Sequence, residues 1–253
     1  MNRQKARLAL AIGMVFLFPL IYYYLSPYVI IMGATAGIIA GDAIVFAGLF
    51  VSSLFLGRVW CGWICPAGAI QELCIKVNSK RFNGKKCNLV KYFIWAPWLS
   101  LTIVLFIQAG GVKSVDLFYQ TWNGISIQNV ASAIMFAVIA GSIAVFSLAT
   151  GRRAACHTIC WMAPFMIAGT KIKNGIGYPS LHLEADKSLC VECKQCSNHC
   201  PMSLNVNEMV QNKSMANTEC ILCGSCVDTC PKKAIKFSFS GLRERLKVNL
   251  STV

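Results

Sequence analysis

The sequence predicts an α-helical membrane domain of four transmembrane helices in two related hairpins, followed by a small C-terminal α+β domain. Of the 253 residues, 56% are hydrophobic and only 13% are charged, which is more typical of membrane proteins than of soluble ones. The apolar character ends near residue 179, and most of the cysteines follow it. The predicted parts are a transmembrane domain (1–170), a linker (171–187), the α+β domain (188–240) and a tail (241–253).

Four windows are apolar enough to cross a bilayer core, which takes roughly 17–25 helical residues. They are residues 8–25, 41–58, 92–109 and 128–149. Residues 28–40 are also apolar but too few to span, so we expect a re-entrant or interfacial segment there. Asp42 stands at the expected outer start of the second window. We expect it to be an N-cap, and the alternative is a quinone-headgroup or proton-transfer role.

The basic residues predict the orientation of the chain. Residues 1–179 carry 15 basic and 3 acidic side chains, whereas residues 180–253 carry 9 and 7. In the apolar part, the basic residues gather before the first window, between the second and third, and after the fourth. The positive-inside rule explains this distribution better than nucleic-acid binding does. We therefore expect a multi-pass protein of the inner (cytoplasmic) membrane, with both termini and the C-terminal domain in the cytoplasm.

The strongest motif is a doubled cysteine run, "CVECKQCSNHCP" at 190–201 and "CILCGSCVDTCP" at 220–231. Every cysteine and the proline recur 30 residues later, the pattern of a bacterial-type ferredoxin with two 4Fe-4S clusters, in which the fourth cysteine of each run binds the other cluster. The expected ligands are Cys190, Cys193, Cys196 and Cys230 for cluster one, and Cys220, Cys223, Cys226 and Cys200 for cluster two. Zinc is the weaker alternative. Residues 181–185 and 235–240 are the expected edge strands.

A second pair of motifs follows the second and fourth windows, "CGWIC" at 61–65 and "CHTIC" at 156–160, each shortly after Gly-Arg. Positions i and i+4 share a helical face, so each pair can offer two ligands to a common centre. The four cysteines are Cys61, Cys65, Cys156 and Cys160. They would suit a third redox centre, iron–sulfur or another thiophilic metal. Thiols that cycle through a disulfide and cysteines that only pack are the alternatives. We expect Cys74 and Cys87 to pack.

Other cofactors and catalytic groups are not predicted. A membrane haem needs axial histidines in its spans, and the three histidines, at 157, 182 and 199, all lie outside the four windows. His157 is expected either to orient a ligand of the CxxxC centre or to lie at the surface. We find no dinucleotide fingerprint and no nucleophile–base pair. We therefore expect an electron-transfer component of an oxidoreductase complex rather than a stand-alone catalyst.

In the ferredoxin cysteines and "CGWICPAG", the chain resembles the NapH-like family of membrane-bound ferredoxin-type (polyferredoxin) proteins, and is similar to NosR-, MauN- and CcoG-type proteins. It departs from them in the second motif, where Trp161 replaces the expected proline and Pro164 follows three residues later. The resemblance implies electron transfer between the membrane quinone pool and redox partners, as a subunit of a larger complex. The alternative is a CcoG-type copper reductase or metal-handling assembly factor that binds Cu(I) through the CxxxC thiols.

Overall fold

A computed structural model describes residues 3–241, except the side chains of residues 85 and 86. The predicted tail therefore lies outside the described residues from position 242 onward. The membrane part contains α1 (Arg3–Ile21), η1 (Tyr22–Leu25), α2 (Pro27–Ala36), β1 (Ile38–Ala40), α3 (Gly41–Leu56), α4 (Val59–Trp63), α5 (Pro66–Cys74), α6 (Gly84–Cys87), α7 (Val90–Gln108), β2 (Ser114–Asp116), α8 (Val130–Thr150), α9 (Ala154–Thr158) and α10 (Ala163–Ile176). The C-terminal part contains β3 (Ser180–Ala185), η2 (Lys187–Leu189), α11 (Gln195–Asn198), α12 (Val206–Gln211), α13 (Ser225–Thr229) and β4 (Ile235–Ser240).

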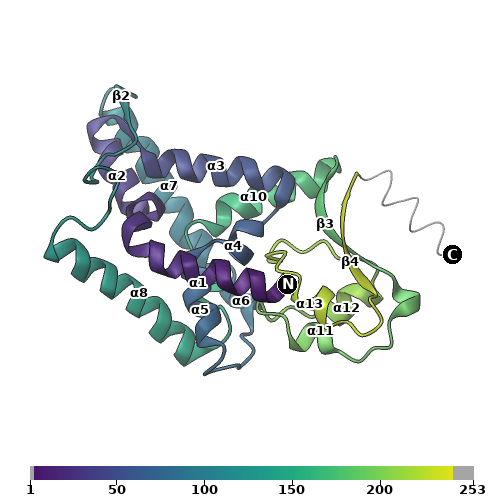
Figure 1. Ribbon diagram of the computed structural model, residues 1–253. Coiled ribbons are helices and arrows are strands. Elements are labelled where there is room, and N and C mark those ends of the chain that lie inside the picture. The colour runs from purple at the N-terminus through teal and green to yellow at the C-terminus, as the bar shows by residue number, and fades with distance from the viewer. Residues whose placement is uncertain (1–2, 242–253) are drawn as a thin grey trace.

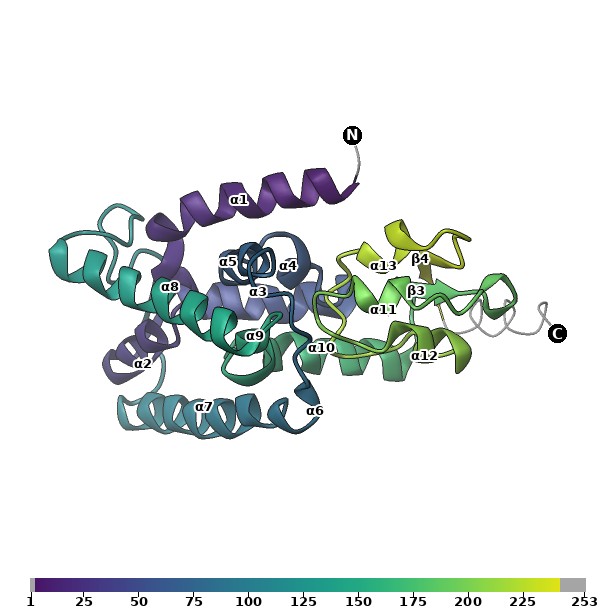
Figure 2. The ribbon, with the colours of Figure 1, turned by 90° about the horizontal axis from the view of Figure 1, so that it is seen from below.

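Helices α1, α3, α7 and α8 run along one direction, from the end that carries α2 and β2 to the end that carries the C-terminal domain (Figures 1 and 2). Three stretches of the described chain are long and apolar enough to cross a membrane: Arg3–Ala36, Val90–Gln108 and Val130–Thr150. Gly41–Leu56 is also apolar but shorter. Each predicted window thus coincides with an apolar helix, and three of the four meet the length of a span.

The outward faces of these helices are apolar. On α8, Ile134, Val138 and Val145 are 59%, 61% and 66% exposed. Their spacings of four and seven residues put them on one side of the helix. A helix in water would bury such a stripe, whereas lipid accepts it. The exposed stripe therefore supports a membrane location for α8.

The prediction that Asp42 is an N-cap is wrong. The N-cap of α3 is Ala40, and Asp42 lies inside the first turn, where its Oδ1 accepts a hydrogen bond from the Ala43 amide at 2.8 Å. Asp42 is 1% exposed, and its Oδ2 has no hydrogen-bond partner in the described structure. The carboxylate lies near the positive end of the α3 dipole without capping the helix.

Two shorter helices return along the long ones. Helix α5 packs against α1 and α8, and α10 packs along α3 and against α7. Each follows a sharp turn at the end of a long helix, at Gly57 (φ 59°, ψ −135°) and Gly151 (φ 121°, ψ −165°). These are conformations that glycine adopts readily and other residues rarely do. Glycine therefore allows the chain to leave α3 and α8 and to enter the two CxxxC segments.

The C-terminal domain is built on one antiparallel pair, β3 with β4, registered from Ser180↔Ser240 to Ala185↔Ile235. Both strands fall where the sequence predicts edge strands, and α11, α12 and α13 lie beside them (Figure 1). The end of α10 and all of β3 fall within the range predicted as a linker, 171–187. Residues 177–179 connect α10 to β3.

Candidate functional site

The two cysteine runs of the C-terminal domain have the same backbone, repeated 30 residues apart. Glu192 and Lys194 in the first run have φ of 53° and 57°, and Leu222 and Gly224 in the second have 50° and 76°. The residues after the Cys-Pro pairs repeat as well, with φ of 54° at Ser203 and 51° at Lys233. Left-handed non-glycine residues cost roughly 1–3 kcal/mol each and cluster at functional sites. Such turns direct successive backbone N–H groups to one anionic centre.

Each run contributes to both of two cavities in this domain. One cavity is lined by three cysteines of the second run and one of the first: Cys220, Cys223, Cys226 and Cys200. The other is lined by three of the first run and one of the second: Cys190, Cys193, Cys196 and Cys230. The Ala234 amide donates a hydrogen bond to Cys230 Sγ at 3.3 Å. These are the two sets that the doubled motif predicts.

The two CxxxC segments are also local copies of one another. Cys61 and Cys156 each occupy the third position of a five-residue helix, α4 or α9. The second cysteine of each motif closes the turn in the same way. The Cys65 amide donates to the Trp60 carbonyl at 2.9 Å, and the Cys160 amide donates to the Ala155 carbonyl at 3.1 Å. After Cys65 the chain enters α5 directly at Pro66, whereas Trp161 and Met162 separate Cys160 from α10.

All four CxxxC thiols line a single cavity of about 210 Å³. Its polar lining includes Arg58 and Gln71, and Gln71 Nε2 lies 3.1 Å from Cys156 Sγ. Its apolar wall comes from α1, η1, α8 and the segment after α9, and includes Phe18, Tyr22 and Ile143. In the described part of the chain, no three His, Cys, Asp or Glu side chains are arranged to hold a single metal ion.

Burial makes the thiols of Cys65, Cys156 and Cys160 poor anions on their own. It raises the pKa of Cys160 to about 12, and it also raises the pKa values of Cys65 and Cys156, to which neighbouring thiols contribute. In the C-terminal domain, burial raises the pKa of Cys220 to about 12 and that of Cys200 to about 11. Ionised thiolates at these positions therefore require nearby positive charge.

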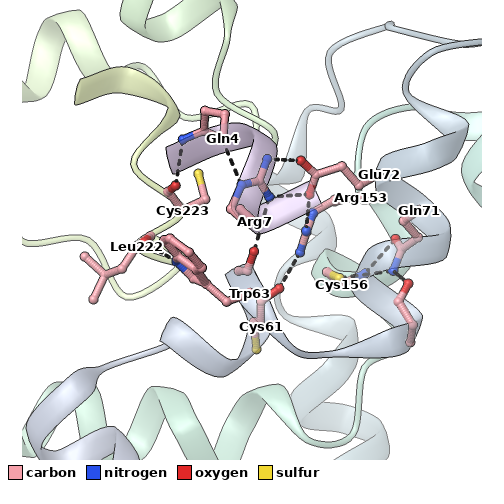
Figure 3. Close-up of polar contacts among 12 residues, drawn as sticks. Gln4, Arg7, Cys61, Trp63, Gln71, Glu72, Arg153, Cys156, Leu222 and Cys223 are labelled. Carbon is pink, nitrogen blue, oxygen red and sulfur yellow. Dashed lines mark hydrogen bonds and ion pairs between the residues drawn. The ribbon is translucent and has the colours of Figure 1, made fainter. Parts of the chain in front are cut away.

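Positive charge is built in beside the CxxxC cavity (Figure 3). Glu72 on α5 accepts from Arg7 Nη1 at 2.8 Å and from Arg153 Nη2 at 2.5 Å. The other nitrogen of Arg153, Nη1, donates to the Cys61 carbonyl at 2.7 Å, and Arg7 Nη1 donates to the Gly62 carbonyl at 3.2 Å. One carboxylate thus holds two arginines against the backbone of the first CxxxC motif.

A second carboxylate, from the C-terminal domain, pairs with two further cations of the membrane part. Glu219, which precedes Cys220, accepts hydrogen bonds from Arg58 at 2.8 Å and from Lys91 at 2.5 Å. The exposed fractions are 1% for Arg58 and 0% for Lys91. Arg58 and Arg153 each stand three residues before the first cysteine of their motif, and each retains a buried Nε with no hydrogen-bond partner in the described structure.

The cluster-two cysteines lie directly against the membrane part. Trp63 Nε1 donates to the Leu222 carbonyl at 3.1 Å, and Gln4 Nε2 donates to the Cys223 carbonyl at 3.1 Å (Figure 3). The two backbones also approach closely, because a Cβ on Gly62 would lie 2.3 Å from the Ile221 carbonyl oxygen. The loop that carries Cys220 and Cys223 therefore packs on α4, beside the CxxxC cavity.

The sequence does not predict the roles of Gln71, Glu72 and Glu219, because their bonding partners lie far away in the chain. Glu72 is 65 and 81 residues from Arg7 and Arg153, Gln71 is 85 from Cys156, and Glu219 is 161 from Arg58. One signal is present, because Glu72 is one of only three acidic residues in the first 179. His157 is 2% exposed and bonds Asn88 at 2.6 Å and the Met202 carbonyl at 3.2 Å. The expectation of a surface histidine is therefore wrong, and burial lowers its pKa to about 4. Cys74 and Cys87 line none of the three cysteine cavities.

Comparison with known proteins gives the same two regions. Residues 43–85, which include the first CxxxC motif, match a 4Fe-4S binding domain, and residues 182–238 match a 4Fe-4S dicluster domain. An uncharacterized protein of Methanocaldococcus jannaschii is 29% identical over 76% of this chain and 76% of its own length. The ferredoxin-type protein NapH of Haemophilus influenzae is 25% identical over 78% of this chain and 69% of its own. No solved structure matches the chain.

A further relative also carries a ferredoxin-type name. The methylamine utilization ferredoxin-type protein MauN of Methylobacillus flagellatus is 24% identical over 62% of this chain and 52% of its own length. With the two 4Fe-4S domain matches and the apolar helices, these similarities make the protein an iron–sulfur electron-transfer protein of membranes. The chain therefore resembles the NapH-like family of membrane-bound ferredoxin-type (polyferredoxin) proteins, as its cysteine motifs predict.

Proposed function

We propose that this protein carries electrons between the membrane quinone pool and redox partners through two 4Fe-4S clusters and a third thiolate-bound centre, as a subunit of a larger complex in the cytoplasmic membrane. The four-span topology, with both termini and the ferredoxin domain in the cytoplasm, belongs to this proposal. The shorter α3 would count as the second span. The matching turns at Gly57 and Gly151 support the two related hairpins.

The residues of the C-terminal domain fit two clusters. Cys190, Cys193, Cys196 and Cys230 would hold cluster one, and Cys220, Cys223, Cys226 and Cys200 would hold cluster two. Bound 4Fe-4S clusters supply one-electron oxidation and reduction. The protein positions the thiols through the doubled left-handed turns, and the backbone N–H groups in those turns favour bound negative charge.

One observation supports the third centre most strongly. Four cations, Arg7, Arg58, Lys91 and Arg153, are buried around the CxxxC segments, and among the described residues two carboxylates, Glu72 and Glu219, pair with them. Unpaired buried charge costs several kcal/mol. The thiolates of Cys220 and Cys223 also lie near Arg58, Arg7 and Arg153 and would offset part of this excess, whereas neutral CxxxC thiols would offset none. A centre bound by four thiolates would supply the missing negative charge and accept the unpaired Nε–H donors.

The cavity also supports a polynuclear centre and a quinone route. The thiols line one space without forming a set suited to a single ion, as expected if a cluster separates them. The wall opposite the thiols is apolar and lies within the membrane helices, so a quinone ring could reach it from the lipid. Arg58 borders this cavity and also binds Glu219, the neighbour of Cys220. The route from the membrane would therefore lead to cluster two.

The metal-handling alternative has one observation in its favour. Met166 Sδ lies 3.5 Å from Cys61 Sγ, and a thioether beside a thiol is a donor set that Cu(I) prefers. A copper reductase or assembly factor of the CcoG type would bind copper at the CxxxC cavity, whereas an electron carrier would not require copper there.

A quinol-reduction experiment tests the proposal. Anaerobically purified protein in detergent is mixed with a menaquinol or ubiquinol analogue, and the visible and paramagnetic resonance spectra of the clusters are followed. We expect quinol-dependent spectral change that the Cys61→Ser/Cys156→Ser variant loses, although dithionite still reduces both ferredoxin clusters in that variant. Clusters that quinol does not reduce or oxidise, together with stoichiometric copper bound at the CxxxC thiols, would replace the electron carrier with the metal-handling function.

A further inference from the structure

The ferredoxin domain has an inner face, toward the membrane part, and an outer end. The cluster-two cysteines belong to the inner face, because Gln4 and Trp63 bond to carbonyls of the loop that carries them. The cluster-one cavity is lined entirely by residues of the domain itself. The segment between β3 and α11, which carries Cys190 and Cys193, lies farthest from the membrane helices in both views (Figures 1 and 2).

Acidic and basic residues of the domain differ in their surroundings. Two acidic residues of the inner face are paired with cations of the membrane part: Glu219 binds Arg58 and Lys91, and Asp228 binds Arg3 at 2.5 Å. The six lysines in the described part of the domain, in contrast, are all exposed. They are Lys187, Lys194, Lys213, Lys232, Lys233 and Lys236. Lys194 and Lys232 line the cluster-one cavity.

The outer end therefore carries a positive excess. Lys236 lies 3.8 Å from Glu184, which it shares with His182. The other five lysines face three further acidic residues of the domain, Asp186, Glu192 and Glu208, and Glu208 lines a cavity shared with the membrane part. Between these charges the surface is apolar, with Leu189 48% and Val191 57% exposed on either side of Cys190. Cys193 is itself exposed. A small apolar centre within a charged rim is the composition of a transient redox interface.

We infer that this outer end, which we call the lysine face, is the docking surface for an acidic redox protein that exchanges one electron with cluster one. The inference rests on the proposed function, because it places the quinone side at the CxxxC cavity and the partner at the opposite end of the route. The exposed apolar residues supply contact area, and the lysines attract and orient a partner whose redox group lies within an acidic rim. One electron leaves the reduced protein and one is gained by the partner, or the reverse.

A membrane surface is the competing occupant, since anionic lipid would also attract lysines. The position of the lysine face argues against it. The face lies at the far end of the ferredoxin domain from the spans, so lipid of the same membrane would meet the domain from the other side. A Debye length of about 8 Å at physiological ionic strength further limits attraction across the domain.

The test uses the whole protein in detergent, with an acidic flavodoxin and the basic cytochrome c as probes. The variant Lys187→Glu/Lys194→Glu/Lys232→Glu is compared with a control of equal charge change, Lys76→Glu/Lys80→Glu/Lys171→Glu. Binding of flavodoxin to the resting protein is measured by titration, and electron transfer from the dithionite-reduced protein is measured by stopped flow. We expect the first variant to lower affinity and rate about tenfold at low salt. It should speed transfer to cytochrome c, and the control should leave all of these values within twofold.

The outcomes separate the two proposals. If the clusters are absent from the wild-type spectra, the proposed function fails before docking is tested. If the clusters are present and reducible but the lysine variant changes neither binding nor rate, the docking surface is wrong. Equal losses in both variants would also overturn it. So would binding of phosphatidylserine vesicles that needs these lysines, when flavodoxin binding does not.

Discussion

Replacing Glu72 with glutamine should destabilise the protein strongly, because this carboxylate is the counter-ion of two buried arginines. The side chains of Glu72, Arg7 and Arg153 are 14%, 7% and 2% exposed. Removing one partner of a buried ion pair costs about 3–5 kcal/mol. Burial raises the pKa of Glu72, but the charges of Arg153 and Arg7 outweigh it and lower that pKa from 4.5 to about 2. That difference corresponds to about 3 kcal/mol, which agrees with the mutational range.

The assay is thermal unfolding in detergent, followed by circular dichroism. For a chain of this size, 1 kcal/mol shifts Tm by roughly 2–4 °C, so Glu72→Gln should lower Tm by about 6–12 °C. Glu208→Gln, at an exposed position of α12, is the matched control and should change Tm by about 1–2 °C at most. A loss below about 3 °C in Glu72→Gln would show that the two arginines do not depend on this carboxylate.

The same ion pair has a defined pH dependence. The folded-state pKa of Glu72 lies below its unfolded value, so the stabilisation is fully present above about pH 4.5 and is lost as the pH falls toward 2. Between pH 5 and 8 the contribution should be flat. Acid titration of Tm should therefore show a smaller acid loss in Glu72→Gln than in wild type, and equal acid losses in both would contradict the assignment.

Three further predictions follow from the site. Cys200→Ser should disturb the cluster held by the second cysteine run and spare the other, and site-resolved spectra in which the first run alone is disturbed would refute the crossover. Gly62→Ala should displace the ferredoxin domain, because the added Cβ would lie 2.3 Å from a backbone oxygen of that domain. This variant should slow quinol-dependent cluster reduction at least tenfold. Gly48→Ala is the control, because a Cβ there would have no atom within 4 Å. A reporter fused after Val253 should be active only in a cytoplasmic format and one near Ser114 only in an external format, and the opposite result for either would end the four-span proposal.

Local patterns in the sequence predict much of this structure. Apolar windows of sufficient length can satisfy their backbone groups only as helices in a membrane, so their positions follow from composition. The cysteine sets follow from a repeat of fixed period, because runs with equal cysteine spacing turn in the same way at Glu192 and Leu222. The Gly-Arg pairs also indicate that the two CxxxC segments have similar backbones. The arginine that corresponds to Arg58 is Arg153, however, and not Arg152, which directly follows Gly151.

The sequence does not predict which distant residues form ion pairs. Glu72 joins Arg7 and Arg153, which lie 65 and 81 residues away, and Glu219 joins Arg58 from 161 residues away. No period or propensity connects such positions, since the partners meet only after the helices and the ferredoxin domain have packed. At Asp42 a local pattern predicts the wrong role. An acidic residue after a glycine at a helix start fits the N-cap pattern, but the chain enters α3 two residues earlier, and the carboxylate is buried instead.

The central claim is that Cys61, Cys65, Cys156 and Cys160 hold a third redox centre, and the iron content of the protein tests it most directly. Two ferredoxin clusters account for about eight iron atoms per chain. Anaerobically purified, fully loaded protein should contain about twelve if the third centre is also a 4Fe-4S cluster. The Cys61→Ser/Cys156→Ser variant should return to about eight while both ferredoxin clusters remain reducible. About eight iron atoms in the wild-type protein, with no other metal and no change in the double variant, would contradict the account and leave these cysteines as packing residues.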